Sequence, residues 1–462
     1  MKSTQKTQTS NIEEKDLENE NSITHGIIWQ QLLLYFFPLL FGTFFQQLYN
    51  TVDAVIVGRF VSKQALAAVG GSSAIIVNLF VGFFVGVSSG ATVIISQYFG
   101  ANDKKSVEKG VHTAVAMALA GGVIFMLLGL AFSSFFISIM NTPADTVTDS
   151  VIYLRIYFCG MIPNLVYNVG AGILRAVGDS KRPLYVLIVS CIANIILDIV
   201  FVLTFHMGVA GVAIATILCQ CLSAVMVIMI LMRSKDSFRL ELKNIRIDRE
   251  ILGKIIYIGL PSGLQSLMYT VSNLLIQTSI NGFDTNTVSA WAAYGKIDCV
   301  FWMIIGSLGI SVTTFAGQNF GAGFYRRVRS GLRQCFIIAI LFTIVLSGLL
   351  LHFGSSIFAL FTTDADVIRV GTEMLTYFVP CYITYIGIEM FSGVLRGMGD
   401  SIWPMIITLT GVCVLRVVWI IVMVPIRHSL TTVMFSYPLT WVVTSVMFLI
   451  YYELYVRKHH IG

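Results

Sequence analysis

The stretch Gly172-Ile-Leu-Arg-Ala-Val-Gly-Asp-Ser-Lys-Arg-Pro183 decides the fold, because it occurs a second time as Gly393-Val-Leu-Arg-Gly-Met-Gly-Asp-Ser-Ile-Trp-Pro404. The two copies are 221 residues apart. Gln97-Tyr-Phe-Gly-Ala101 recurs at the same offset as Gln318-Asn-Phe-Gly-Ala322. Matches in one order at one spacing indicate an internal duplication of about half the chain.

The composition places this duplicated unit in a membrane. The chain has 462 residues, of which 56% are hydrophobic and 12% charged, and its mean hydropathy is +0.82. Soluble domains are about 25% charged. Apolar runs near the ~20 residues that cross a bilayer recur along the chain. We predict twelve spans, at residues 30–58, 66–98, 109–138, 151–174, 183–205, 208–232, 251–281, 287–318, 333–354, 370–395, 403–425 and 429–456.

These spans predict an all-α integral membrane protein with twelve transmembrane helices. Six spans per copy is an even number, so both copies enter the membrane from the same side and form two parallel six-helix repeats around a central cavity. The expected parts are a disordered cytoplasmic tail (1–26), an N-lobe (27–232), a cytoplasmic inter-lobe loop (233–250), a C-lobe (251–456) and a short cytoplasmic tail (457–462).

The net charge of +6 follows topology and does not indicate a nucleic-acid partner. The odd-numbered loops hold few basic residues, among them Arg59, Lys63 and Arg427, whereas the even-numbered loops are rich in Lys and Arg. The positive-inside rule therefore places the even loops and both termini in the cytoplasm of a multi-pass cell-membrane protein.

Asn194-Ile-Ile-Leu-Asp198 is the most unusual stretch within a span. It lies in a run from Leu184 to Phe205 that has no other charge. An ionised carboxylate in hydrocarbon costs at least ~2.5–3.5 kcal/mol, and such residues are usually functional. Asn194 precedes Asp198 by four residues, so both side chains lie on one helix face.

The first span carries a second polar stripe, Gln46, Asn50 and Asp53, beyond Pro38, which we expect to act as a helix hinge. Asp53 lies nine residues before the turn near residue 62, and Asp198 nine before the turn near residue 207. Thr216 lies nine residues after that second turn. Each is then ~13 Å from its turn, so the three share one level of the N-lobe with Asn194, and Gln220 follows one turn beyond Thr216.

Two carboxylates at one level in a low dielectric require either a shared proton or a bound cation. We therefore predict an H⁺ or Na⁺ site at Asp53, Asn194, Asp198 and Thr216, with Gln46, Asn50 and Gln220 as accessory residues. Oxygen ligands suit both ions, and no other cofactor or metal is expected.

The C-lobe lacks this set, because the repeat places Trp419 opposite Asp198 and Leu415 opposite Asn194. Glu389 is expected either to contact substrate or to pair with Arg416. Lys296 and Asp298 are structural or lie at one edge of the cavity. Other candidates for the substrate cavity are Gln265, Asn273 and Gln277.

Enzyme motifs are not supported. Gly86-Val-Ser-Ser-Gly90 matches a nucleophile-elbow pattern but lies mid-span with no strand before it. The sequence has no Gly-x₄-Gly-Lys-[Ser/Thr] phosphate loop, so ATP is not expected to drive this chain.

These features resemble the multidrug and toxic compound extrusion (MATE) family of cation-coupled exporters over residues 30–455. The Gln-x-Phe-Gly-Ala segments, the Leu-Arg-x-x-Gly-Asp-Ser turns and the Pro38, Asp53, Asn194–Asp198 and Thr216 set carry the resemblance. It implies that these polar residues match the family's N-lobe proton or sodium site. Where the family's second-lobe pattern has a glutamate in helix seven, this chain offers Gln265, so the chain looks most like the DinF-like branch.

The resemblance implies antiport of H⁺ or Na⁺ against small organic cations or other amphipathic drugs by alternating access, by a monomer in the lipid bilayer. Two alternatives stay open at this point. One is a lipid-linked precursor flippase of the same superfamily, and the other is an ion channel.

Overall fold

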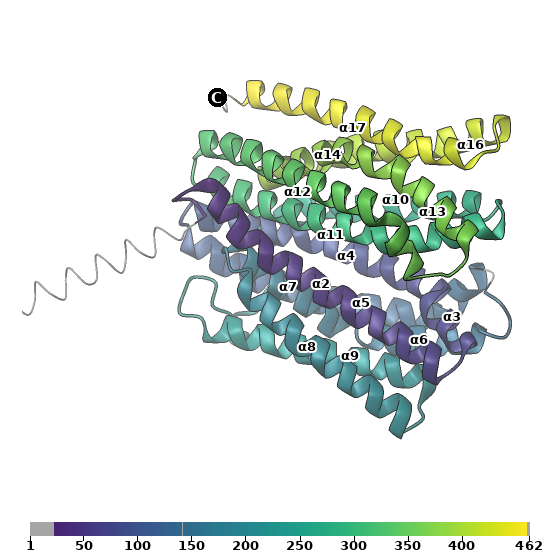
Figure 1. Cartoon of the computed structure of the whole chain (residues 1–462). Helices are drawn as coiled ribbons and strands as arrows, with labels where there is room; N and C mark the ends of the chain where they lie inside the picture. The colour runs from purple at the N-terminus through teal and green to yellow at the C-terminus, as the bar shows by residue number, and fades with distance from the viewer. Residues whose placement is uncertain (1–22, 141, 460–462) are drawn as a thin grey trace, which may run out of the picture.

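The computed structural model describes residues 23–140 and 142–459 as helices joined by short loops (Figure 1). The first copy of the repeat contains α2 (Ile28–Phe60), α3 (Lys63–Gly70), α4 (Ser72–Gly100), α5 (Lys104–Ile139), α6 (Val147–Cys159), α7 (Met161–Ala176), α8 (Lys181–Ile199), the π-helix η1 (Val200–Thr204) and α9 (Gly208–Arg233). After the 3₁₀ turn η2 (Leu242–Asn244), the second copy contains α10 (Arg249–Ile280), α11 (Thr285–Gly321), α12 (Tyr325–Ala359), α13 (Ala365–Phe378), η3 (Val379–Cys381), α14 (Tyr382–Gly397), α15 (Ile402–Thr408), the π-helix η4 (Leu409–Val414), α16 (Leu415–Ile426) and α17 (Leu430–Lys458).

The predicted all-α membrane architecture is confirmed. Among the described residues, eleven helices are long and apolar enough to cross a membrane, and a twelfth span results if α6 and α7 are counted together. These two helices meet at a bend of 50°. Each of the twelve predicted apolar runs therefore corresponds to one helix, or to consecutive helices within one span.

Both ends of the described chain lie at one end of the bundle (Figure 1). We refer to it as the terminal end and to the opposite one as the far end. An even number of spans produces this arrangement, as the sequence predicts.

The first part of the first helix of each copy packs into the hydrophobic core of the other copy. Leu32, Phe36 and Leu39 of α2 belong to the core of the second copy, while Ile251 and Ile258 of α10 belong to the core of the first. These segments precede or include the paired prolines, Pro38 and Pro261, which lie inside otherwise continuous helices. The lobes are therefore interlocked near the terminal end, and the predicted boundaries at residues 27 and 251 do not separate the cores strictly.

The repeated Gly-Asp-Ser turns have the same backbone in both copies. Gly178 has φ +96° and Gly399 has φ +95°, a left-handed conformation that favours glycine. In the first turn, Asp179 Oδ1 accepts hydrogen bonds from the backbone N–H of Lys181 and Arg182, at 3.1 and 3.0 Å. The aspartate thus caps the next helix.

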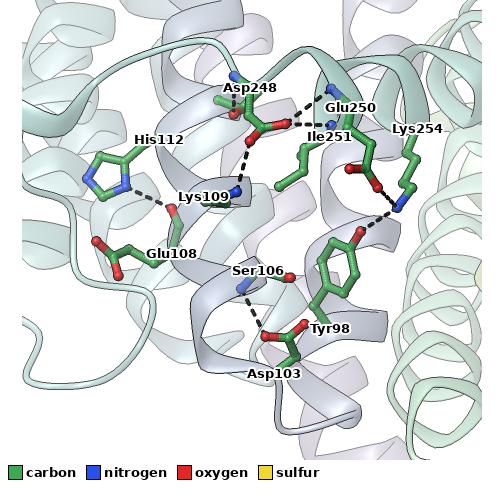
Figure 2. Close-up of polar contacts among 11 residues, drawn as sticks. Tyr98, Asp103, Ser106, Glu108, Lys109, His112, Asp248, Glu250, Ile251 and Lys254 are labelled. Carbon is green, nitrogen blue, oxygen red and sulfur yellow. Dashed lines mark hydrogen bonds and ion pairs between the residues drawn. The ribbon is translucent and has the colours of Figure 1, made fainter.

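The inter-lobe loop is fastened to the first lobe (Figure 2). Lys109 Nζ lies 3.2 Å from Asp248 Oδ2, and Asp248 caps α10 through the N–H groups of Glu250 and Ile251. His112, which is buried, accepts a hydrogen bond at Nε2 from the Glu241 N–H, at 3.0 Å. The loop therefore follows the first lobe and connects it to the start of α10.

The first described residues also have defined contacts. Ile23 is buried, and Arg327 donates hydrogen bonds to the backbone carbonyls of His25 and Gly26, at 2.8 and 2.9 Å. Asn319 Nδ2 lies 3.4 Å from the Ile23 carbonyl. Residues 1–22 of the predicted tail, and residues 460–462, lie outside the described residues.

Candidate functional site

The structure brings together the four residues of the predicted ion site. Asp53 of α2 interacts with Asp198 and Asn194 of α8 and with Thr216 of α9. All four are buried, and Asp198 has no exposed surface. The three helices that carry them pack against one another. The equal spacing from the turns therefore does lead to one shared cluster.

The cluster contains polar atoms with no hydrogen-bond partner in the described structure. These atoms are Asp53 Oδ1, both carboxylate oxygens of Asp198, and Oδ1 and Nδ2 of Asn194. The Thr216 hydroxyl donates to the Val212 carbonyl in its own helix, at 3.0 Å, which leaves its oxygen lone pairs available. A buried polar group without a partner costs about 1–3 kcal/mol, and more if it is charged. A proton or a small cation would satisfy these oxygens.

A cavity of about 40 Å³ adjoins the cluster. Most of its lining residues carry polar side chains, and they include the cluster residues Asn194 and Thr216. The further lining residues are Gln46, Tyr49, Asn164, Tyr167, Asn168, Leu187, Ser190, Cys219, Gln220 and Ser223. The space accommodates one or two water molecules or a partly dehydrated cation.

Of the three accessory residues predicted from the sequence, two line the cavity and one does not. Gln46 and Gln220 line the cavity, and Gln220 Nε2 lies 3.5 Å from the Tyr157 hydroxyl. Asn50 is exposed and does not line it. Pro38 lies inside α2, which is helical from Ile28 to Phe60.

A π-helix lies next to the site and is not predicted by the sequence. Val200–Thr204 forms η1, which begins two residues after Asp198. Single π turns inside helices are rare and occur frequently at functional sites. Hydrophobic periodicity carries no clear signal for a π turn, because the residues Val200-Phe-Val-Leu-Thr204 are compatible with an ordinary span.

The second lobe has no matching acid pair. Gln265 donates to the Thr408 hydroxyl, at 3.1 Å, and Gln277 donates to Asn281, at 2.8 Å. Asn273 is exposed. The structure therefore does not bring these three candidates together into one polar cluster.

One predicted alternative for Glu389 is wrong. Glu389 does not pair with Arg416 but with Arg396 of the same helix, at 3.6 Å between Oε1 and Nη2. Arg416 lies in the neighbouring span, whereas Arg396 lies two turns further along α14. A long arginine side chain can span that distance.

Arg416 instead occupies the position in the second lobe that corresponds to the ion site of the first. Residue 416 minus the repeat offset falls between Asn194 and Asp198, and Tyr437 corresponds to Thr216. The Arg416 guanidinium lies 4.1 Å from the centre of the Tyr437 ring and donates to the Thr440 hydroxyl, at 3.1 Å. A positive charge thus stands where the first lobe has acids.

The lobes approach closely from the terminal end as far as the middle of α4. A Cβ on Gly86 would lie 2.6 Å from the backbone of Gly263, and one on Gly100 would overlap the Gln318 carbonyl. Tyr35 links both lobes, because its hydroxyl contacts the Arg175 carbonyl, at 2.9 Å, and Thr314, at 3.1 Å. We call this line of contacts the seam.

Two parallel six-helix lobes, one of which carries a buried acid pair within its spans, define a secondary membrane transporter. The chain belongs to the MatE family, whose model matches residues 38–200 and 261–422. The two matches begin at the paired prolines and cover the two copies of the repeat. This agrees with the family resemblance inferred from the sequence; the DinF-like branch stays a prediction.

Similar proteins are named for multidrug resistance or multidrug export. The chain is 25% identical over 442 residues to the probable multidrug resistance protein YoeA of Bacillus subtilis. The match covers 94% of this chain and 95% of that protein. It is 22% identical to the multidrug export protein MepA of Staphylococcus aureus, over 81% of this chain and 82% of that one.

The fold is that of known transporters of the family. A multidrug resistance MATE family transporter in an outward-facing conformation matches with a TM-score of 0.88 at 21% identity, over 94% of this chain and 97% of that one. A MATE crystal structure in a straight conformation matches with a TM-score of 0.87 at 22% identity, over 94% and 98%.

Proposed function

We propose that this protein is a cation-coupled antiporter that exports organic, mainly cationic, drugs or toxic compounds by alternating access. The coupling ion is H⁺ or Na⁺ and is a transported substrate, not a resident cofactor. The observation that carries the proposal is the buried pair Asp53 and Asp198, in which Asp53 Oδ1 and both oxygens of Asp198 lack hydrogen-bond partners among the described residues.

The pair can couple two fluxes because its charge depends on its occupant. When a proton or Na⁺ is present, the pair is neutralised and the surrounding helices can pack closely. When the ion leaves, two carboxylates at close range repel each other and favour a different arrangement of α2, α8 and α9. A ligand shifts a conformational equilibrium only through such a difference in affinity between states.

The seam supports the alternating-access part of the proposal. The lobes meet at and near the terminal end, which the positive-inside rule assigns to the cytoplasm. In our proposal this arrangement is the state that is closed to the cytoplasm. Ion entry from outside then neutralises Asp53 and Asp198, reshapes α2 around Pro38 and releases the drug outward. We also propose that the protein acts as a monomer in the cell membrane.

Transport by purified protein in liposomes tests the proposal. Ethidium flux is measured with an imposed pH gradient and, separately, with an imposed Na⁺ gradient. Antiport predicts uphill ethidium movement with one gradient and none when that gradient is collapsed. A flux that follows only the ethidium gradient would indicate a channel, and movement of a fluorescent lipid-linked substrate without ethidium transport would indicate a flippase.

A further inference from the structure

The second lobe contains a cluster of aromatic rings that lies outside the ion site. Phe301 and Tyr382 stack with ring centres 4.0 Å apart, and Trp302 meets Tyr385 edge to face at 4.7 Å. Trp441 joins Trp302 and Tyr385 at 6.3 and 5.7 Å. The rings come from α11, α14 and α17, so three helices build one aromatic wall.

Asp298 of α11 lies within this wall. Its Oδ1 accepts hydrogen bonds from the hydroxyls of Tyr382 and Tyr294, at 2.5 and 3.2 Å. Its Oδ2 accepts one from the Trp302 indole N–H, at 2.5 Å. Three donors on two helices therefore hold the carboxylate in one orientation. Such fixation is expected for a group that recognises a ligand.

The held carboxylate has no counter-charge in the described structure. No ion pair of Asp298 occurs among residues 23–140 and 142–459. Lys296 is exposed and two residues away, so it projects from another side of the helix. Arg416 is held by Tyr437 and Thr440 instead. A carboxylate inside a span without a charged partner is a functional-site hypothesis by default.

This group is partly exposed. Trp302 is 36% exposed and Asp298 is half-buried, although both belong to a tightly packed wall. On α11, the Thr314 hydroxyl meets the Tyr35 hydroxyl in the seam. Asp298 is sixteen residues closer to the far end than this contact, ~24 Å along the helix. It therefore lies on the far-end side of the Tyr35–Thr314 contact, on a helix that also packs against α2 and α4 of the first lobe.

We propose that Asp298 and Trp302 bind the positively charged, planar part of the exported compound. The carboxylate supplies the countercharge, and the partly exposed Trp302 indole supplies stacking and cation–π attraction, which is strongest for tryptophan. This inference rests on the proposed function and adds to it. The first lobe binds the coupling ion, and the second lobe selects cationic aromatic compounds.

The test compares two probes in liposomes that hold wild-type protein, Asp298→Asn or Trp302→Phe. Ethidium is a planar permanent cation, and norfloxacin is largely zwitterionic at neutral pH. Asp298→Asn removes the charge, and Trp302→Phe removes the indole N–H and part of the ring face. We expect each change to raise the KM for ethidium roughly tenfold with a much smaller effect on norfloxacin, while the dependence on the ion gradient is unchanged. Glu373→Gln, which neutralises an exposed carboxylate paired with Arg369, is the control and keeps the wild-type KM.

Cys299 supplies a second measurement that needs no variant. It is half-buried and follows Asp298 directly in the sequence. We expect ethidium to slow alkylation of Cys299 by a thiol reagent, with no effect on the exposed Cys221. This readout decides the matter if Asp298→Asn does not fold.

The outcomes separate this inference from the proposed function. If the wild-type protein moves no ethidium against either ion gradient, the proposed function fails. If wild-type transport is coupled but the KM for ethidium in Asp298→Asn is unchanged, or Cys299 is not protected, the inference is overturned. Loss of ion coupling in Asp298→Asn with an unchanged KM would overturn it too, because Asp298 would then belong to the coupling site.

Discussion

Gln97 and Gln318 form reciprocal hydrogen bonds between the two lobes. Gln97 Nε2 donates to the Gly397 carbonyl, at 2.8 Å, and Gln318 Nε2 donates to the Ala176 carbonyl, at 2.7 Å. Each glutamine belongs to one Gln-x-Phe-Gly-Ala segment, and each acceptor precedes the Gly-Asp-Ser turn of the opposite copy. The two repeated motifs are therefore the two halves of one contact, made twice across the seam.

Removing both glutamine side chains should loosen the seam. A hydrogen bond contributes about 1 kcal/mol net, so the double variant Gln97→Ala/Gln318→Ala should shift the equilibrium between closed and open terminal ends roughly 30-fold. Spin labels on the exposed residues Lys105 and Arg326 report the separation of the lobes, and we expect a longer distance to become populated. The control is Gln64→Ala, at an exposed position, which should leave the distance distribution between the labels unchanged. If the double variant also leaves that distribution unchanged, the glutamines do not hold the seam.

A side chain at Gly100 should prevent closure of the seam. A Cβ there would overlap the backbone of Gln318, which cannot move aside as a flexible side chain would. We expect Gly100→Ala to reduce transport strongly, roughly tenfold or more, with normal expression and thermal stability. Gly253→Ala in α10 is the matched control, because no described atom outside the neighbouring turns of its own helix lies within 4 Å of the added Cβ. Wild-type transport by Gly100→Ala would mean that the close approach is not needed in the cycle.

The sequence predicts the architecture well because its signals are local and repeated. Span length and hydropathy identify the helices, and the offset of 221 residues between the copies identifies the two lobes. The cluster of Asp53 and Asp198 is also predictable, since equal distances from turns place side chains at equal depth. None of this requires knowledge of how side chains pack.

What the sequence does not predict depends on packing between distant segments. The crossing of α2 and α10 into the opposite cores has no periodic signature, and neither has the π-helix after Asp198. Glu389 pairs with Arg396 because of side-chain reach, which spacing alone does not reveal. Asp298 stays ambiguous in the sequence because its donors, Tyr382 and Trp302, are separated by a whole span.

The loop that joins the lobes should become less firmly attached at acidic pH. The N–H of Ile251 and then the Lys109 ammonium hold the pKa of Asp248 below its usual value. A carboxyl whose pKa is lowered on folding contributes stability above its unfolded pKa of about 3.9, and loses it as the pH falls through the lower folded pKa. Wild-type protein in detergent should therefore exceed Asp248→Asn in melting temperature at pH 7 and 5, with the difference shrinking as the pH falls below about 4. A difference that is constant down to pH 3, or absent at pH 7, would contradict this assignment.

The acid pair of the first lobe should behave as one unit. Asp53→Asn and Asp198→Asn each leave a single carboxyl group. Without the second carboxyl group, binding and release of the coupling ion no longer switch the charge of a pair. We therefore expect each change to abolish gradient-driven ethidium efflux, and the double variant to lose no more than either single one, because residues that act as a unit are not additive. Thermal stability should be equal to or above wild type, since a buried charge without a hydrogen-bond partner is removed. The exposed Asp145 supplies the control, and Asp145→Asn should export ethidium normally. Efflux at the wild-type rate by Asp198→Asn, with an unchanged dependence on the gradient, would place the coupling ion elsewhere in the molecule.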